Sequence, residues 1–401
     1  MCRLFLIIVL CISGLEISGQ SFDSLKEDST DSNNELPRYI VIETKYQHGQ
    51  HITTGVEALE ETVESNPYNI FELRVGWRGY GRKRWQQLHN FMTYGVSLHH
   101  AAFQPYNNIL GNPTSVCLYM DYPFIRTKYF WFGLDIAVGP AFGFKPYDPV
   151  TNPDQTAIGS AINLLFQPNL NLGFKVNKRF DLAIEAGLTH YSDGRTRTPN
   201  KGVNLMGIGL KAVYNLRPFY KDGRDAQYLP DRPHLNKVKL PKHKDYFELI
   251  ISGGVGVTGS YDHYETKDDT YYAAMGLTLD GAIKYAHVAR AGIGFDVFFD
   301  GSLEEEYDFG NHSSPIPIEN KIYGGIHISH EFLIHRFAVI TQYGRTFRNV
   351  PGRGKSYVVA GCRYDLSEKV FLKIVLKTPT ALIADFALLG AGFTINSKKK
   401  S

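Results

Sequence analysis

FDLAIEAGLTHYSDGRTRTPNKGVNLMGIGLKAVYNL, residues 180–216, predicts a β-hairpin. We expect its first strand at 180–192 and its second at about 203–216. The turn between them, residues 193–201, is rich in Gly, Thr, Pro and Asn. Successive side chains of a strand point to opposite faces, so even-numbered and odd-numbered residues separate. The even-numbered face of both strands is apolar along most of its length.

This face becomes polar only at the turn end of the hairpin, where His190, Ser192 and Asn204 gather. An apolar strand face meets a core in a soluble protein and lipid in a membrane barrel. The hairpin alone does not distinguish these two environments, but the rest of the chain does.

Similar alternation recurs along the chain and predicts sixteen strands. Eight lie near residues 38–52, 69–80, 92–104, 115–126, 128–144, 160–177, 179–192 and 203–216. Eight more lie near 247–260, 271–283, 288–300, 319–330, 335–347, 356–366, 369–378 and 382–395. Charged residues such as Arg290 and Asp296 lie opposite the apolar face. Paired charges inside and apolar residues outside favour a membrane barrel over a soluble sandwich.

The chain is therefore expected to be an all-β, transmembrane antiparallel β-barrel protein with two eight-stranded halves. The halves could close as two barrels or as one 16-stranded barrel with a wide lumen. A basic, proline-containing segment at the midpoint favours two. The expected organisation is a signal peptide (1–19), a flexible leader (20–37), a first barrel (38–216), a linker (217–245), a second barrel half (246–397) and a basic tail (398–401).

The N-terminus has the pattern of a secretory signal, with Arg3 before an apolar run that is too short to span a bilayer comfortably. Cleavage is expected before Gln20. Two cysteines follow, Cys117 and Cys362, and we expect two separate thiols, with one disulfide as the alternative. The net charge of +3 gives no reason to expect a nucleic-acid partner.

The polar tip of the hairpin has the residue types of a hydrolase. His190 and Ser192 are two residues apart on one strand face, about 7 Å apart along the strand. A neutral imidazole could take the serine proton, and Asn204 could hold the other ring nitrogen. Turn amides near Asp193 and Gly194 could face a developing oxyanion. The alternative is an ordinary polar sheet rim without catalysis.

The segments His190-Tyr191-Ser192-Asp193-Gly194 and Pro199-Asn200-Lys201-Gly202-Val203-Asn204 resemble the signature of the lipid A 3-O-deacylases, or acyloxyacyl hydrolases. That signature is His-x-Ser-Asn, a short turn, then Pro-Asn-x-Gly-x-Glu. The resemblance implies an eight-stranded outer-membrane barrel that hydrolyses the 3-linked ester of lipid A with a Ser-His-Glu triad facing lipid. Ser192 would be the nucleophile and His190 the base. Residues 217–401 lie outside this resemblance.

Two positions depart from the family pattern. Asn204 stands where the family has Glu, which leaves the histidine without a charged partner and should weaken the base. Asp193 stands where the family has Asn, and a carboxylate there would oppose an oxyanion unless it pointed elsewhere or were protonated. Glu185 cannot replace the missing acid, because its odd position puts it on the lumen face.

The sequence thus predicts an esterase of the bacterial outer membrane that removes an acyl chain from lipid A or lipopolysaccharide without a cofactor or metal. One alternative is a non-enzymatic outer-membrane barrel, either a pore or a structural protein, with a degenerate site. Another is a soluble lipid-binding barrel.

Overall fold

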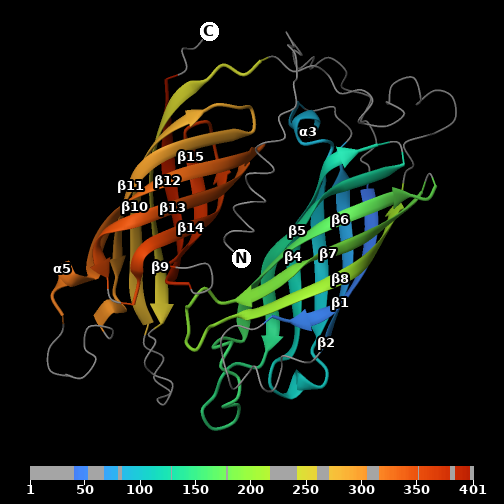
Figure 1. The fold of residues 1–401 in the computed structure, drawn as a ribbon, viewed down its shortest axis with the longest axis horizontal. Helices are drawn as coiled ribbons and strands as arrows, with labels where there is room; N and C mark the ends of the chain where they lie inside the picture. Colours follow the sequence, from blue (N-terminus) through green and yellow to red (C-terminus); the bar gives the residue numbers. More distant parts are fainter. Residues whose placement is uncertain are drawn as a thin grey trace.

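The computed structural model describes residues 40–52, 67–79, 84–127, 129–177, 179–216, 242–259, 271–304, 316–350, 352–379 and 384–397, which form two closed antiparallel barrels (Figure 1). The first contains β1 (Ile40–His51), β2 (Pro67–Arg78), β3 (Thr93–Ala102), β4 (Gly111–Arg126), β5 (Phe130–Phe144), β6 (Ile162–Lys175), β7 (Phe180–Ser192) and β8 (Val203–Asn215). The second contains β9 (Tyr246–Gly259), β10 (Tyr271–Lys284), β11 (Ala289–Asp300), β12 (Ile322–Ile334), β13 (Phe337–Val350), β14 (Gly354–Asp365), β15 (Val370–Thr378) and β16 (Phe386–Asn396).

Each barrel closes on its own first strand. In the first barrel β1 pairs with β8, with Val41 opposite Asn215. In the second β16 pairs with β9, with Leu389 opposite Val255. The predicted sixteen strands are thereby confirmed within the described residues, and the single 16-stranded barrel is excluded in favour of two barrels of eight.

The structure also contains three short helical elements that the sequence analysis did not predict. They are α3 (Arg84–Leu88), the 3-10 turn η1 (Tyr106–Asn108) and α5 (Ile318–Lys321). Of the helices in the described ranges, none has the length and apolarity needed to cross a membrane. Cys117 is buried, Cys362 is exposed and both are free thiols, as expected. The predicted signal peptide, the leader, most of the linker and the basic tail lie outside the described residues.

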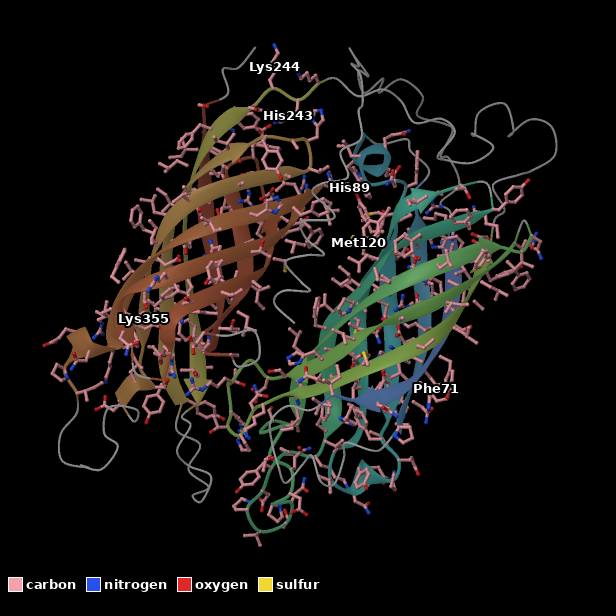
Figure 2. The ribbon with its side chains drawn as sticks, in the orientation of Figure 1. Phe71, His89, Met120, His243, Lys244 and Lys355 are labelled. Carbon is pink, nitrogen blue, oxygen red and sulfur yellow. The ribbon has the colours of Figure 1, made fainter. Side chains whose placement is uncertain are left out.

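The outward positions of the strands in both barrels carry mostly apolar side chains. Phe71 is 54% exposed and points away from the wall (Figure 2), and Leu210 is 64% exposed. In the second barrel Leu277 is 65% exposed. Strand residues alternate between exposed and buried along both walls. A continuous apolar outer surface around a polar interior is the arrangement of a transmembrane barrel, and it is unfavourable in water.

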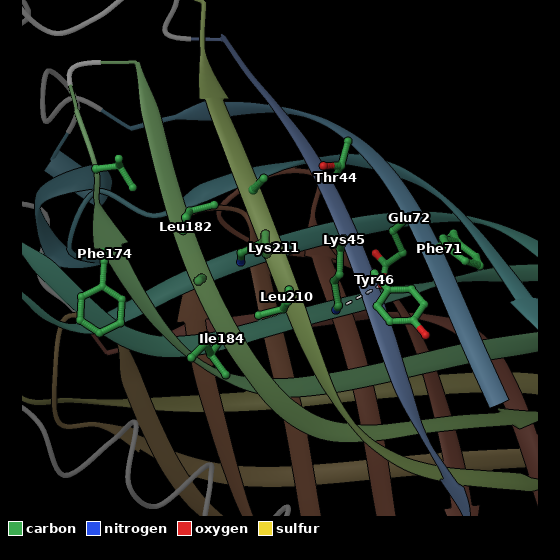
Figure 3. Close-up of a pocket in the computed structure, with 13 residues that line it drawn as sticks. Thr44, Lys45, Tyr46, Phe71, Glu72, Phe174, Leu182, Ile184, Leu210 and Lys211 are labelled. Carbon is green, nitrogen blue, oxygen red and sulfur yellow. Dashed lines mark ion pairs between the residues drawn. The ribbon is translucent and has the colours of Figure 1, made fainter. Parts of the chain in front are cut away.

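Ion pairs occupy part of the lumen of the first barrel. Lys45 Nζ lies 3.2 Å from Glu72 and 2.9 Å from Glu185, and Lys211 Nζ lies 2.8 Å from Glu185. Figure 3 shows the Lys45–Glu72 pair beside apolar wall residues such as Leu210. Charges buried this deeply are tolerated only when they are paired. Glu185 faces the lumen as its odd position predicts, so it cannot serve the hairpin tip.

The second lumen is also polar, with a different arrangement of charges. Arg290 donates to Glu248 at 2.7 Å and to Glu331 at 2.6 Å. Asp296 lies 2.7 Å from the Nδ1 atom of His327. The two residues that sequence analysis singled out therefore both face the lumen, each with a partner of its own.

The two barrels touch each other at both ends. At one end Trp85 of α3 stacks on His335, with ring centroids 5.4 Å apart. His89, on the side that faces the second barrel (Figure 2), lies edge-on to Phe332 at 5.7 Å. At the opposite end the β7–β8 turn contacts the second barrel, where the Gly259 amide donates to the Arg195 carbonyl at 2.7 Å. The second barrel therefore adjoins the hairpin tip.

Candidate active site

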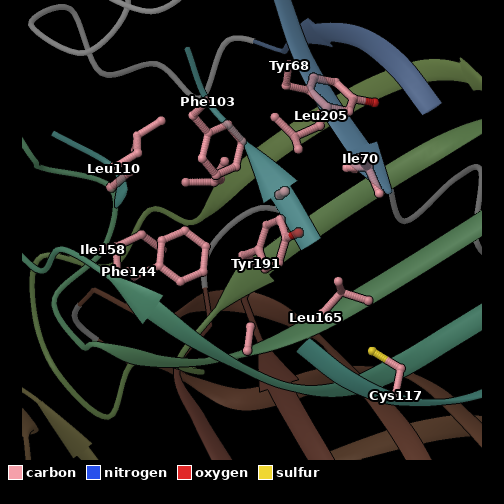
Figure 4. Close-up of a cluster of buried hydrophobic side chains, with 14 of the residues drawn as sticks. Tyr68, Ile70, Phe103, Leu110, Cys117, Phe144, Ile158, Leu165, Tyr191 and Leu205 are labelled. Carbon is pink, nitrogen blue, oxygen red and sulfur yellow. The ribbon is translucent and has the colours of Figure 1, made fainter. Parts of the chain in front are cut away.

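The end of β7 is oriented by Tyr191, whose side chain is buried in an apolar cluster inside the first barrel (Figure 4). Its ring packs edge-on against Phe144, with centroids 5.0 Å apart, and also against Phe103. Because neighbouring strand residues point to opposite faces, this inward anchor turns His190 and Ser192 outward.

The ring of His190 is held by the facing strand. His190 and Asn204 are direct partners in the β7–β8 register, and His190 Nδ1 lies 2.7 Å from Asn204 Oδ1. An amide oxygen only accepts hydrogen bonds, so Nδ1 carries the proton in this contact. The tautomer leaves Nε2 free of a proton and able to accept one. The structure thus brings these two predicted residues together as the sequence suggested.

Gly202 closes the other side of the ring. Its φ is +77°, and a Cβ atom at this position would lie 2.7 Å from His190 Cε1. Both the backbone conformation and the lack of space favour glycine. Gly202 stands in the quoted motif, but sequence reasoning gave it no role.

The hydroxyl of Ser192 is held by the turn. Its Oγ accepts from the Gly194 amide at 3.1 Å and from Asn200 Nδ2 at 2.9 Å. The Gly194 contact agrees with the predicted turn support. Asn200 is a residue that sequence reasoning missed, although its place in the Pro-Asn-x-Gly motif was a visible clue.

Within the described hairpin, no hydrogen bond joins the His190 ring to Ser192 Oγ. The two side chains share one face of β7 at its end, as predicted. Hydrogen bonds between a base and its nucleophile often form only when substrate is bound. In the absence of substrate, the hydroxyl of Ser192 is held by the turn and the ring of His190 by Asn204.

Asp193 follows Ser192 directly and lies outside both strands. Its Oδ2 accepts from the Arg197 amide at 3.3 Å, so the carboxyl points into its own turn. Burial raises the pKa of Asp193 to about 7, although the amides of residues 195–197 and the Arg197 charge favour the ionised form. Near neutral pH about half of this carboxyl is therefore protonated, which would weaken its repulsion of a negative charge that developed nearby.

Two models of known protein families match this chain, one over each barrel. Residues 71–212, which include the hairpin tip, match the family model of the lipid A 3-O-deacylase, PagL. The first barrel belongs to the lipid A 3-O-deacylase family. Residues 246–397 match a separate model, the acyloxyacyl hydrolase C-terminal domain. The resemblance to the deacylases that the sequence showed ended at residue 216. The second match is therefore the first indication that the other barrel is similar to a domain of acyloxyacyl hydrolases.

Solved structures resemble this chain only distantly. A crystal structure of the outer membrane enzyme PagL has 14% identity and a TM-score of 0.30, covering 42% of this chain and 97% of the other. A Rh. blastica porin mutant has 9% identity and a TM-score of 0.19, with coverages of 89% and 99%. The siderophore receptor PirA from Acinetobacter baumannii has 8% identity and a TM-score of 0.23, with coverages of 91% and 81%. TM-scores this low support no argument, and no curated protein matches the chain.

Proposed function

We propose that the first barrel hydrolyses the 3-O-linked hydroxyacyl ester of lipid A in the bacterial outer membrane, after removal of a signal peptide at 1–19. Ser192 is the nucleophile, His190 the base and Asn204 the group that orients the base. The observation that carries the proposal is the His190–Asn204 pair at 2.7 Å beside a serine hydroxyl that is held by two donors.

The chemistry follows from these contacts. His190 Nε2 takes the Ser192 proton as Oγ attacks the ester carbonyl. In the resting site the Gly194 amide and Asn200 Nδ2 donate to Oγ. As Oγ bonds to the ester carbon, we expect these donors to move to the carbonyl oxygen and to stabilise the negative charge that develops there. The imidazolium then protonates the departing sugar oxygen, and water hydrolyses the acyl-enzyme. The products are a free hydroxy acid and a sugar hydroxyl, and no cofactor takes part.

The outer wall beside the site suits an acyl chain. Leu164 is the β6 partner of Ser192, and Met206 and Ile208 follow Asn204 on the outward face of β8. All three are exposed on the apolar exterior. A substrate that is itself embedded in the membrane can lay its chain along this wall without leaving lipid.

The direct test is turnover by the purified full chain in vesicles that contain lipid A. We expect mass spectrometry to detect lipid A that has lost one hydroxyacyl chain, together with one equivalent of the free hydroxy acid. Unchanged lipid A would reject the proposal, provided that heat-modifiable gel mobility demonstrates a folded barrel. Such a result would favour the non-enzymatic alternative with a degenerate site. The ion pairs and the buried apolar clusters inside the two barrels speak against the pore form of that alternative.

The pH dependence tests the role of the turn. As pH rises through about 7, Asp193 becomes ionised, and its charge opposes the oxyanion beside Gly194. We expect kcat to fall roughly tenfold on this alkaline limb. Replacement of Asp193 by Asn keeps the shape and removes the charge, so the fall should disappear. An identical alkaline limb in Asp193→Asn would contradict this assignment.

A further inference from the structure

The active-site turn is built against the second barrel, in a contact that the deacylation chemistry does not itself require. The Gly259 amide at the end of β9 donates to the Arg195 carbonyl at 2.7 Å. Arg197 Nε donates to Tyr271 Oη at the start of β10, also at 2.7 Å. Figure 1 shows this yellow-green turn beside β9. Two hydrogen bonds therefore join the turn to neighbouring strands of the other barrel.

The turn also makes a close apolar contact there. A Cβ atom on Gly194 would lie 3.5 Å from Ala387 Cβ and 3.5 Å from Leu376 Cδ1. Leu376 belongs to β15 and Ala387 to β16. Four strands of the second barrel thus meet the segment that contains the Gly194 amide, which donates to Ser192 Oγ.

Arg195 is the centre of this contact. Only 2% of its surface is exposed, and its positive charge acts on the carboxylate of Asp300 at the end of β11. Asp300 also accepts from Arg353 Nε at 2.8 Å, and Arg353 lies 3.4 Å from Asp385. Lys377 is the second partner of Asp385. The rim of the second barrel therefore offers a polar, charged environment in which a buried arginine can be accommodated.

The backbone of Arg195 points to the same conclusion. Its φ is +65°, directly after Gly194 at +68°. Glycine adopts this left-handed conformation freely, but a residue with a side chain is strained in it and remains there only when its surroundings hold it. The surroundings of Arg195 are the rim of the second barrel, through both its carbonyl and its side chain.

Building on the proposed function, we propose that the second barrel is a positioning element for catalysis in the first. Its rim holds Arg195, and Arg195 in turn keeps the Gly194 amide on Ser192 Oγ. Arg195 is thus a positioning residue, and the second barrel acts as a built-in partner of the active site rather than as an independent unit.

Replacement of Arg195 by Gly separates the anchor from the backbone conformation. Glycine keeps the left-handed turn and relieves its strain but removes the side chain. We expect kcat of the full chain in lipid A vesicles to fall about 10- to 100-fold with KM unchanged, because misplacement of one donor affects the transition state. Arg195→Lys, which keeps the charge, should recover part of the loss. Arg179→Ala, at the other end of the same hairpin, is the matched control and should retain wild-type kcat.

Wild-type kcat in Arg195→Gly would overturn the proposal, as would a loss confined to KM. Amide hydrogen exchange gives a second readout that does not depend on turnover. Exchange at Gly194 and Gly259 should accelerate in Arg195→Gly and stay unchanged in Arg179→Ala. If the wild type fails to cleave lipid A, the proposed function fails, whereas unchanged exchange at both glycines in Arg195→Gly rejects the anchor itself.

Discussion

Ser192→Ala is expected to lower deacylation of lipid A by about 10⁴-fold or more, the scale on which hydrolases lose kcat when the nucleophile is removed. The methyl group of alanine cannot form an acyl-enzyme. Both donors at Oγ, the Gly194 amide and Asn200 Nδ2, remain in place, so a small residual rate can persist. The substitution removes one oxygen at the end of β7, and the barrel should fold normally.

The measurement is mass spectrometry of lipid A from cells that express each variant at a matched level in the membrane. Ser160→Ala is the control, because its hydroxyl accepts from the Ile162 amide in a neighbouring loop and has no part in the proposed chemistry. We expect the control to match the wild type. Full deacylation by Ser192→Ala would eliminate Ser192 as the nucleophile.

Asn204→Glu is expected to raise kcat by about 10- to 100-fold. Asn204 fixes the tautomer of His190, but as a neutral group it gives little stabilisation to the imidazolium that forms when Ser192 is deprotonated. In a serine protease triad, the change from carboxylate to amide costs about 10⁴-fold, because the amide holds the wrong tautomer of the histidine. The gain expected here is smaller, because Asn204 already holds the productive tautomer and glutamate adds only the charge. Steady-state turnover in lipid A vesicles gives the comparison.

A matched control exists on the same barrel wall. His48 Nδ1 lies 3.0 Å from Asn69 Oδ1, a second outward histidine–asparagine pair. Asn69→Glu adds the same charge beside this histidine, away from Ser192, and should leave kcat unchanged. A rate for Asn204→Glu at or below that of the wild type would indicate that the site is adapted to asparagine.

Most of the fold could be predicted, because every strand of a lipid-facing barrel alternates between apolar outward residues and polar inward residues. From Leu205 onward in β8, outward residues such as Leu210 alternate with inward residues such as Lys211. This alternation predicts where the strand lies and which of its faces meets lipid. Closure could not be predicted in the same way. Whether Val41 pairs with Asn215 or with a more distant strand depends on contacts far apart in sequence, which carry no local period.

The candidate site also has a part that could be predicted and a part that could not. The strand ends contain His190, Ser192 and Asn204, and the even numbers of these residues predict that they share one face. Asn200 and Gly202 belong to the turn, where the backbone path and not a period places each group. The contact of the second barrel with Arg195 could not be predicted from the sequence. Nothing near Arg195 or near Gly259 indicates that the two residues meet.

The contacts at both ends of the barrel pair also have a mechanical consequence. The contacts of Trp85 with His335 at one end and of Arg195 with Gly259 at the other oppose a tilt of either barrel alone. Hydrophobic mismatch with the bilayer must then be met by the pair as a unit. The height of Ser192 relative to the sugar headgroups is therefore set by two apolar belts together, so membrane thickness should influence which ester reaches the serine.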